Sequence, residues 1–345
     1  MPRSRRRTGS LGITLGLGTA LTLALTTAGC AAPADGPEAA AGAPGSTTLT
    51  SCGRQLTVAA PPRRAVTLDQ NSTELLLELG LGARMAGTAN LKTKVAGEYR
   101  DAYAKVPVLS PKVLGGEQLR AAEPDFVLGG SAELYTGDRA GTREELGALG
   151  LPAFVSAVDC PELSRPPRPA FELLFDDYLA LGRAFGVTDR AERLAAGQRE
   201  RVALAAATAG RVQGAPTVVW LYSSFNGTPY VAGGTGMPHE MSRLVGARNA
   251  FDDVAEDWPE VTWEEIAARD PDFLVIGDLS ERGKPGDSAA EKRALLTGHP
   301  VVSKLRAVRE NRIVEVPGIE MDPSVRSVHA LELLAAGMKD LGHVR

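Results

Sequence analysis

Two segments of the chain share one sequence pattern. "EQLRAAEPDFVLGG" occupies residues 117–130, and "EEIAARDPDFLVIGD" occupies residues 264–278. In each, a glutamate opens a short Ala-rich stretch that ends in an acid, Pro-Asp-Phe and an apolar run. Glu264 follows Glu117 by 147 residues, and the two prolines are separated by the same interval. Each copy predicts a helix, a turn and a strand, so the repeat predicts two lobes of similar build.

The rest of the chain supports this division. Short β-rich runs alternate with helical runs on both sides of the middle, which is typical of an α/β fold with mostly parallel sheets. Asn71 or Ser72 is the expected N-cap of the first helix. Residues 170–208 are Ala- and Arg-rich, helical in pattern and without strand signals. We predict two similar α/β lobes joined by a long connecting helix, divided as follows: N-terminal lobe 51–168, connecting helices 169–210, C-terminal lobe 211–345.

The first 29 residues have the features of an export signal. Several arginines precede an apolar stretch that is too short and Gly-rich for a membrane span. The stretch ends in "TTAGC", which resembles the lipobox of bacterial lipoproteins except for Thr27, where Leu is usual. This predicts a lipoprotein signal peptide over 1–29 and lipid on Cys30; an ordinary signal peptide is the alternative. General secretory and twin-arginine export both stay open.

Residues 30–50 are built mainly from Ala, Pro, Gly, Ser and Thr and are predicted to form a flexible tether. Two further cysteines, Cys52 and Cys160, follow it. An exported protein meets an oxidising environment, so we predict a disulfide between them, with two buried free thiols as the alternative. The formal charge of −4 gives no basic footprint for nucleic acid.

Patterns that would indicate an enzyme or a resident metal are missing from the sequence. The four histidines are scattered, with no i, i+4 pair, and there is no G-x-S-x-G motif. "VAGGTGMP" (231–238) lacks the glycine spacing and lysine of a phosphate-binding loop, so we interpret it as a turn with Pro238 at the first helical position. We therefore expect no catalytic residues, no metal site and no intrinsic cofactor. An exported α/β hydrolase is the remaining enzymatic alternative.

Aromatic and hydroxyl side chains follow one strand of the second half. Tyr222 and Tyr230 lie there among serines and a threonine. Ligands of open α/β sheets bind beyond the carboxyl ends of the strands, where such groups stack on and hydrogen-bond small molecules. A strand pair with exposed tyrosines is the alternative.

Several stretches in this order resemble the iron-siderophore and cobalamin-type substrate-binding proteins of bacterial ABC importers. They are "RAVTLDQNSTELLLELGLGARMAGTA", "GEQLRAAEPDFVL", "WLYSSFNGTPYVAGGTGMPHEMSRLVGARNAFDD", "VTWEEIAARDPDFLVI" and "VRENRIVEVP". The resemblance runs from Cys52 to the C-terminus. It implies a ligand held between two lobes that move little, a class III fold with a helical backbone, and delivery to an ABC permease dimer with its ATPase subunits. With lipid on Cys30, the protein is expected on the outer face of the cytoplasmic membrane.

The resemblance also implies a ligand class. We expect a small chelate, first of all an Fe(III)-siderophore, and keep a corrinoid, heme, a deazaflavin-cofactor precursor or a bare metal ion as alternatives. Aromatic and cationic side chains at strand ends or in loops are the expected contacts: Tyr222, Tyr230, Arg326, Lys112, Tyr135 and Trp258, with Arg139 as a further candidate.

The repeated glutamates gain a role from the same resemblance, which implies that one glutamate on each lobe docks to permease arginines. In "TWEE", Thr262 is a predicted N-cap and Glu265 its partner at N3, which leaves Glu264 at N2 without a structural role. Gly115, Gln118 and Glu117 fill the same positions in the first copy. We predict that Glu117 and Glu264 dock to the permease. The alternative is that they only complement the helix dipole, worth ~0.3–1 kcal/mol.

Overall fold

The computed structural model describes residues 46–163 and 168–345. The predicted signal peptide, Cys30 and most of the predicted tether lie outside these residues. The expectation that the tether reaches residue 50 is wrong, because Thr47–Ser51 form β1, which pairs antiparallel with β2 (Arg54–Val58). Composition alone suggested a tether, but in β1 Leu49 is buried between two exposed threonines, which is the period-2 pattern of a half-buried strand.

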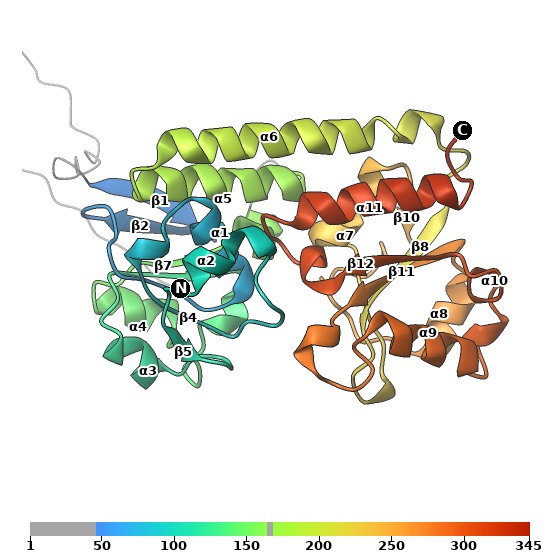
Figure 1. The fold of residues 1–345 in the computed structure, drawn as a ribbon, viewed down its shortest axis with the longest axis horizontal. Coiled ribbons are helices and arrows are strands. Elements are labelled where there is room, and N and C mark those ends of the chain that lie inside the picture. The colour runs from blue at the N-terminus through green and yellow to red at the C-terminus, as the bar shows by residue number, and fades with distance from the viewer. Residues whose placement is uncertain (1–45, 164–167) are drawn as a thin grey trace, which may run out of the picture. The chain divides into compact units, whose positions relative to one another are not determined.

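The N-terminal lobe is built on a parallel sheet of five strands in the order β5-β4-β3-β6-β7 (Figure 1). Its strands are β3 (Ala65–Thr67), β4 (Met85–Ala89), β5 (Val108–Ser110), β6 (Phe126–Gly129) and β7 (Ala153–Val155). Its α-helices are α1 (Gln70–Glu78), α2 (Arg100–Tyr103), α3 (Gly116–Ala121) and α4 (Arg143–Ala148).

The C-terminal lobe has a second sheet of five strands. Four run parallel in the order β10-β8-β11-β12, and β9 pairs antiparallel with β8. The strands are β8 (Thr217–Ser223), β9 (Tyr230–Val231), β10 (Arg248–Asn249), β11 (Phe273–Asp278) and β12 (Ile313–Pro317). The α-helices are α7 (Gly236–Leu244), α8 (Trp263–Arg269), α9 (Ala289–Gly298), α10 (Arg306–Arg309) and α11 (Ser327–Asp340).

Two long helices connect the lobes, α5 (Ala170–Ala184) and α6 (Thr188–Ala206). In Figure 1, α6 runs along α5 of the first lobe and α11 of the second. Gly182 lets α5 and α6 approach closely, since a Cβ there would lie 2.3 Å from the Cβ of Ala191. The predicted fold class is therefore confirmed: two α/β lobes with mostly parallel sheets, joined by a long helix.

The repeated sequence takes the same place in both lobes. α3 leads into β6, which lies between β3 and β7, and α8 leads into β11, which lies between β8 and β12. The acid before each proline adopts a left-handed conformation, with φ of 45° at Glu123 and 41° at Asp270. That conformation ends each helix, and the following Pro-Asp-Phe starts the central strand.

A disulfide joins Cys52, in the turn between β1 and β2, to Cys160, beyond the end of β7. The predicted pairing is thus present in the structure. It connects the start of the folded domain to the last strand of the first lobe. Within the described residues, no helix combines the length and apolar character needed to cross a bilayer.

Candidate functional site: the interlobe cleft

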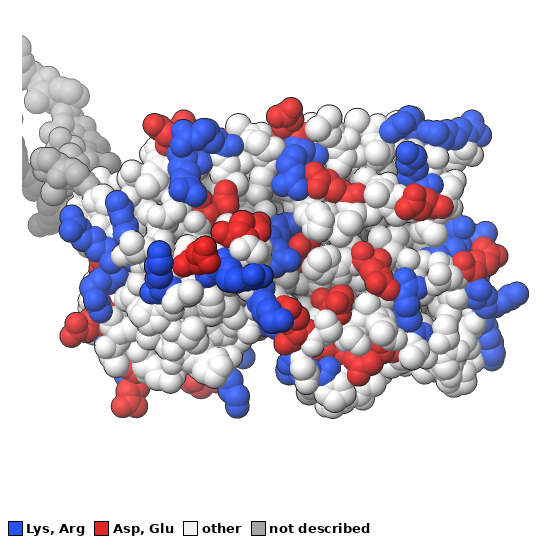
Figure 2. Space-filling view, in the orientation of Figure 1, with Lys and Arg blue, Asp and Glu red and all other residues white. Residues whose placement is uncertain are grey.

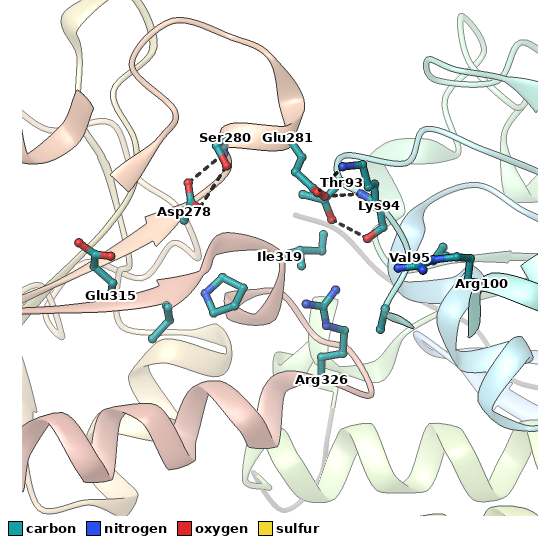
Figure 3. A pocket seen from close by; sticks show the side chains of 13 residues that line it. Thr93, Lys94, Val95, Arg100, Asp278, Ser280, Glu281, Glu315, Ile319 and Arg326 are labelled. Carbon is teal, nitrogen blue, oxygen red and sulfur yellow. Dashed lines mark hydrogen bonds and ion pairs between the residues drawn. The ribbon is translucent and has the colours of Figure 1, made fainter. Parts of the chain in front are cut away.

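The two lobes face each other across a hollow of about 620 Å³ (Figure 3). From the first lobe, the loop after β4 contributes; from the second, the carboxyl ends of β11 and β12 and the start of α11 contribute. This is where an open parallel sheet places its ligands. The lining residues are Thr93, Lys94, Val95, Ala96, Arg100, Asp278, Ser280, Glu281, Glu315, Val316, Pro317, Ile319 and Arg326.

An interlobe triad of Lys92, Tyr222 and Asp322 connects the two lobes. The Lys92 ammonium donates to the Tyr222 hydroxyl (2.9 Å) and to Asp322 Oδ2 (3.0 Å), and the Tyr222 hydroxyl lies 3.2 Å from the same carboxylate oxygen. The side chains of Lys92 and Asp322 are 35% and 12% exposed. Burial opposes the charged form of Lys92, but Asp322 and Tyr222 together outweigh it and raise the lysine pKa. Burial, together with Asp322, raises the pKa of Tyr222 to about 12.

A second cluster surrounds Arg326 at the start of α11. Its guanidinium donates twice to Glu320 Oε1, at 3.0 and 2.8 Å, and lies 3.6 Å from Glu74 Oε1 of the first lobe. Glu320 also contacts the His329 ring at 2.7 Å. Glu74 is fully buried, and burial raises the pKa of its carboxyl group. One guanidinium therefore lies between two buried carboxylates from different lobes.

A third connection lies at the rim of the hollow. Glu281 accepts from the backbone N–H of Lys94 at 2.6 Å and lies 3.2 Å from its ammonium (Figure 3). The Lys94 side chain is 84% exposed, so this pair is solvated and adds little to stability. Figure 2 shows basic and acidic side chains gathered together over the boundary between the lobes.

An aromatic pair lies beside the triad. Tyr222 and Trp258 stack with ring centroids 4.6 Å apart. Next to Trp258, Asp257 has a buried Oδ1 without a hydrogen-bond partner among the described residues, and burial followed by the Asp322 charge raises the pKa of Asp257 to about 7. The half-buried carboxyl group therefore titrates near neutral pH.

The glycine-rich segment supports the loop that carries Trp258. A Cβ at Gly233 would lie 2.1 Å from Glu256 O, and one at Gly234 would lie 2.5 Å from Asp252 O. Only glycine permits this close approach of two backbones. The prediction that Pro238 is the first helical residue is wrong, because α7 already begins at Gly236 after the N-cap Thr235.

Of the predicted contact residues, Arg326 lines the hollow, whereas Tyr222 and Trp258 stack on each other at the interlobe triad and are not among the lining residues. Tyr222 and Arg326 are both already engaged with carboxylates of this chain. Tyr230 is half-buried and its hydroxyl donates to Glu260. Within the described residues, no group of three or more His, Cys, Asp or Glu side chains is placed to hold a metal ion.

Two predicted contacts lie elsewhere. The prediction for Tyr135 is wrong: the side chain is 5% exposed, packs in the core of the first lobe and donates to the Phe154 carbonyl at 2.7 Å. Lys112 is exposed after the edge strand β5 and does not line the hollow. Arg139, a further candidate, donates to the Glu133 carbonyl. The hydroxyl group of a tyrosine suggests, from sequence alone, that the side chain is exposed. In the core, however, a backbone carbonyl can accept the hydrogen bond of that hydroxyl.

Sequence reasoning missed Lys92, Asp322 and Asp257. The two residues that Lys92 contacts are 130 and 230 positions further along the chain, so no local sequence pattern predicts these contacts. One signal was present: Lys92 follows β4 by a few residues, and the loops at the carboxyl ends of parallel strands are where ligand contacts are expected.

The two repeated glutamates are exposed at equivalent positions. Glu117 and Glu264 are each the second residue of their helix, α3 and α8. Thr262 and Glu265 form the predicted capping box, with bonds of 2.7 and 3.1 Å, and Gln118 Oε1 accepts from the backbone N–H of Gly115. Neither Glu117 nor Glu264 has an ion pair or side-chain hydrogen bond within the part of the chain that the structure describes.

Each lobe also carries a charged side chain that ties two adjacent strand ends together. In the first lobe, Asp69, rather than Asn71 or Ser72, caps α1, accepting from Ser72 N at 2.8 Å and from Gly130 N, beyond β6, at 2.5 Å. In the second, fully buried Lys292 donates to the carbonyls of Tyr222 (2.6 Å), Gly277 and Asp287 (2.9 Å). Burial lowers the pKa of Lys292 to about 8.

Known proteins are similar to this chain in sequence or in fold. A Bacillus subtilis (strain 168) protein described as an uncharacterized ABC transporter substrate-binding lipoprotein is 24% identical over 91% of this chain and 93% of its own length. A periplasmic binding protein from Veillonella parvula is 28% identical with a TM-score of 0.73, over 85% of this chain and 97% of its own. An ABC-type Fe3+-hydroxamate transport protein from Saccharomonospora viridis is 25% identical with a TM-score of 0.70, over 85% and 98%.

A family model covers most of the folded region. The model described as periplasmic binding protein matches residues 66–319, which include both sheets and the connecting helices. The matched region also contains most of the interlobe cleft. This chain belongs to the periplasmic binding protein family.

Proposed function

We propose that the chain is the lipid-anchored receptor of an ABC importer and that its ligand is an Fe(III)-siderophore, most specifically a hydroxamate chelate. The family consists of substrate-binding proteins, not enzymes, and implies an ABC permease and a small-molecule ligand. The similarity to an Fe3+-hydroxamate transport protein supports the choice of chelate. The ligand that such a receptor carries to its permease is its cargo.

The cleft is the observation that supports this proposal. Polar groups from both lobes line a hollow of about 620 Å³, and the Tyr222–Trp258 pair lies at the interlobe triad. A compact chelate needs such a site, in which aromatic faces supply contact area and a few polar groups fix orientation. A corrinoid, heme or deazaflavin-cofactor precursor would use the same surfaces and is the alternative cargo.

Intrinsic tryptophan fluorescence tests both whether the cargo binds and whether it binds near Trp258. Titration with a ferric tris-hydroxamate chelate is expected to quench the emission of Trp258, which stacks on Tyr222 of the interlobe triad. The quenching should persist in Trp220→Phe, whose indole is fully buried in the core, and be strongly reduced in Trp258→Phe. Calorimetry on both variants separates loss of signal from loss of binding. Absence of heat with hydroxamate, heme and corrinoid probes would contradict the proposal.

Glu117 and Glu264 are the proposed docking residues for the permease. Both are exposed at the second position of equivalent helices, and in Figure 1 α3 and α8 lie on the side of their lobes away from α6. A carboxylate at the positive end of a helix stays ionised and available to arginine. Such pairs steer association and fix register.

Reconstituted vesicles containing the cognate permease test the docking role. Glu117→Ala combined with Glu264→Ala should bind cargo normally yet fail to stimulate transport. Glu265→Ala is the matched control, because it removes a neighbouring carboxylate that is committed to the Thr262 cap. Wild-type transport by the double variant would leave both glutamates as helix-dipole partners only.

The proposed anchor is lipid on Cys30, which lies outside the described residues. Cys30→Ala is expected to release the protein from membranes or to leave unprocessed precursor, as judged by fractionation and mass spectrometry. A membrane-bound variant of mature size would contradict the anchor while leaving cargo binding unaffected.

A further inference from the structure

We infer that the cleft selects cargo by charge: it accepts an uncharged or cationic chelate, disfavours an anionic one, and Asp322 is the residue that sets this preference. The inference rests on the proposed function, because it concerns the cargo of the same site. It follows from how the cationic side chains of the cleft are already used. It also runs against the usual expectation that lysine and arginine in a cleft mark an anionic ligand.

The first observation is the interlobe triad. The Lys92 ammonium is 3.0 Å from Asp322 Oδ2, and the Tyr222 hydroxyl reaches the same oxygen. The anion position between these two donors is therefore taken by a carboxylate of the protein. An anionic group on the cargo would have to displace Asp322, which would leave that carboxylate, 12% exposed, without its cation. Unpaired buried charge is strongly unfavourable.

The second observation is the cluster around Arg326. Its single guanidinium serves two carboxylates, Glu320 and Glu74, and both are buried. Glu74 Oε2 is buried with no hydrogen-bond partner among the described residues. The chain's own acids thus already engage the guanidinium before cargo binds, and Glu320 also contacts the His329 ring at 2.7 Å. Arg326 was expected to face an anionic chelate, but the structure surrounds it with the chain's own acids.

The third observation is the surface beside the triad. Asp257 adds a further carboxyl group with an unpartnered buried oxygen, close enough to Asp322 for that charge to raise its pKa. The Tyr222–Trp258 pair adds electron-rich ring faces, which attract cations. At the rim, Lys94 is paired with Glu281, and exposed Arg100 is in solvent, where salt screens its field.

Three chelates that differ only in one terminal group test the inference. The probes are a linear ferric tris-hydroxamate with a free terminal amine, the same chelate N-acetylated, and the same chelate N-succinylated, so that the ends are cationic, neutral and anionic. Calorimetry at physiological ionic strength is expected to show the succinylated form binding at least ~10-fold more weakly than the other two, because one like charge near 6 Å has about this effect. The wild-type ranking tests the charge preference itself, apart from the residue that sets it.

Asp322→Asn identifies the residue responsible. The substitution leaves the Lys92 charge uncompensated. The succinylated chelate should therefore gain about 10-fold in affinity, and the chelate with the free amine should bind more weakly than it does to wild type. Glu332→Gln is the control with the same charge change: Glu332 pairs with Arg201 on the helical side of the molecule, and the ranking should stay as in wild type. A thermal melt of each variant confirms folding.

Two results would overturn the inference while leaving the proposed function intact. One is equal or tighter binding of the succinylated chelate by the wild-type protein. The other is an unchanged ranking in folded Asp322→Asn. Failure of all three chelates to bind would contradict the proposed cargo, and the inference would fail with it.

Discussion

In each lobe, one charged side chain holds the ends of two adjacent strands together, and the two side chains have charges of opposite sign. In the first, the Asp69 carboxylate ties the ends of β3 and β6 by accepting from backbone N–H groups. In the second, the Lys292 ammonium ties the ends of β8 and β11 by donating to backbone carbonyls. These strand pairs are equivalent, because β6 and β11 carry the repeated sequence. The two lobes therefore share a side-chain connection between equivalent strands, but one connection uses a carboxylate acceptor and the other an ammonium donor.

The difference between the ties also predicts their strengths. Asp69 is partly exposed and shares its oxygens with a helix cap, so water can replace it in part. Lys292 is fully buried, so water cannot readily take the place of its ammonium group as a donor to the three carbonyls. A buried group that loses its partner costs much more than an accessible one. The C-terminal lobe should be far more sensitive to loss of its tie.

Lys292→Met is expected to have the largest effect. Methionine keeps the length of the side chain but removes the ammonium donor from three carbonyl oxygens, of which that of Asp287 retains the Leu279 N–H at 2.9 Å. The free energy of unfolding should fall by about 3–5 kcal/mol. Urea denaturation followed by circular dichroism measures it. Lys339→Met, an exposed change on α11, should stay within about 0.5 kcal/mol. Similar losses of unfolding free energy in the two variants would contradict the proposed role of Lys292 in holding the strand ends together.

The next effect is a pH dependence from Asp177 of α5, which adds a tie at the end of β7. It accepts from Ser156 Oγ (2.7 Å) and Ala157 N (3.0 Å), and burial raises its pKa to about 7. Between about pH 4 and 7 the folded state therefore holds a proton that the unfolded state has lost. Stability should fall as pH rises through this window, by about 3–4 kcal/mol in total.

Comparison of wild type with Asp177→Asn isolates this contribution. The amide cannot ionise, so the fall in stability between about pH 4 and 7 should be smaller in the variant. Denaturation series at several pH values give the difference. A wild-type protein that becomes more stable with rising pH relative to the variant would show that the carboxyl group is ionised in the fold.

Asp69→Ala should cost less, about 1–2 kcal/mol, since it removes one helix cap and one acceptor for Gly130. Asp69→Asn retains an acceptor oxygen and should cost roughly half as much. Hydrogen exchange at Gly130 gives a local readout, because its amide is expected to lose protection in the alanine variant first. A cost for Asp69→Ala equal to that of Lys292→Met would remove the contrast between the lobes.

The smallest effects concern the repeated helices. Thr262→Ala should destabilise by about 1 kcal/mol through loss of the cap of α8. Gly115→Ser should stabilise by a few tenths of a kcal/mol, because Gly115 has a φ of −85° and a Cβ there meets only Gln118 Oε1 at 3.7 Å. Thermal melts of the two variants should shift in opposite directions. Shifts in one direction would mean that the helix starts are not equivalent.

The fold was accessible from the sequence because its signals are local. The repeated Pro-Asp-Phe segments, the Thr262 cap and the long helical stretch are each encoded within about forty residues. The site was only partly accessible. Tyr222 was found because it lies near the end of a strand, and Trp258 because it lies in a loop. Lys92 and Asp322, in contrast, meet only when both lobes are folded. Tyr135 failed for a related reason, since burial depends on what packs over a residue and not on its neighbours in sequence.

The close approach of Gly233 and Gly234 to the loop that carries Trp258 has an evolutionary consequence. A single methyl group at either glycine would push the loop away and shift the aromatic pair without altering any residue that faces the cargo. Cargo preference can therefore drift through positions that a comparison of binding residues would ignore. Relatives that match this chain at every cleft position but lack these glycines are expected to carry different molecules.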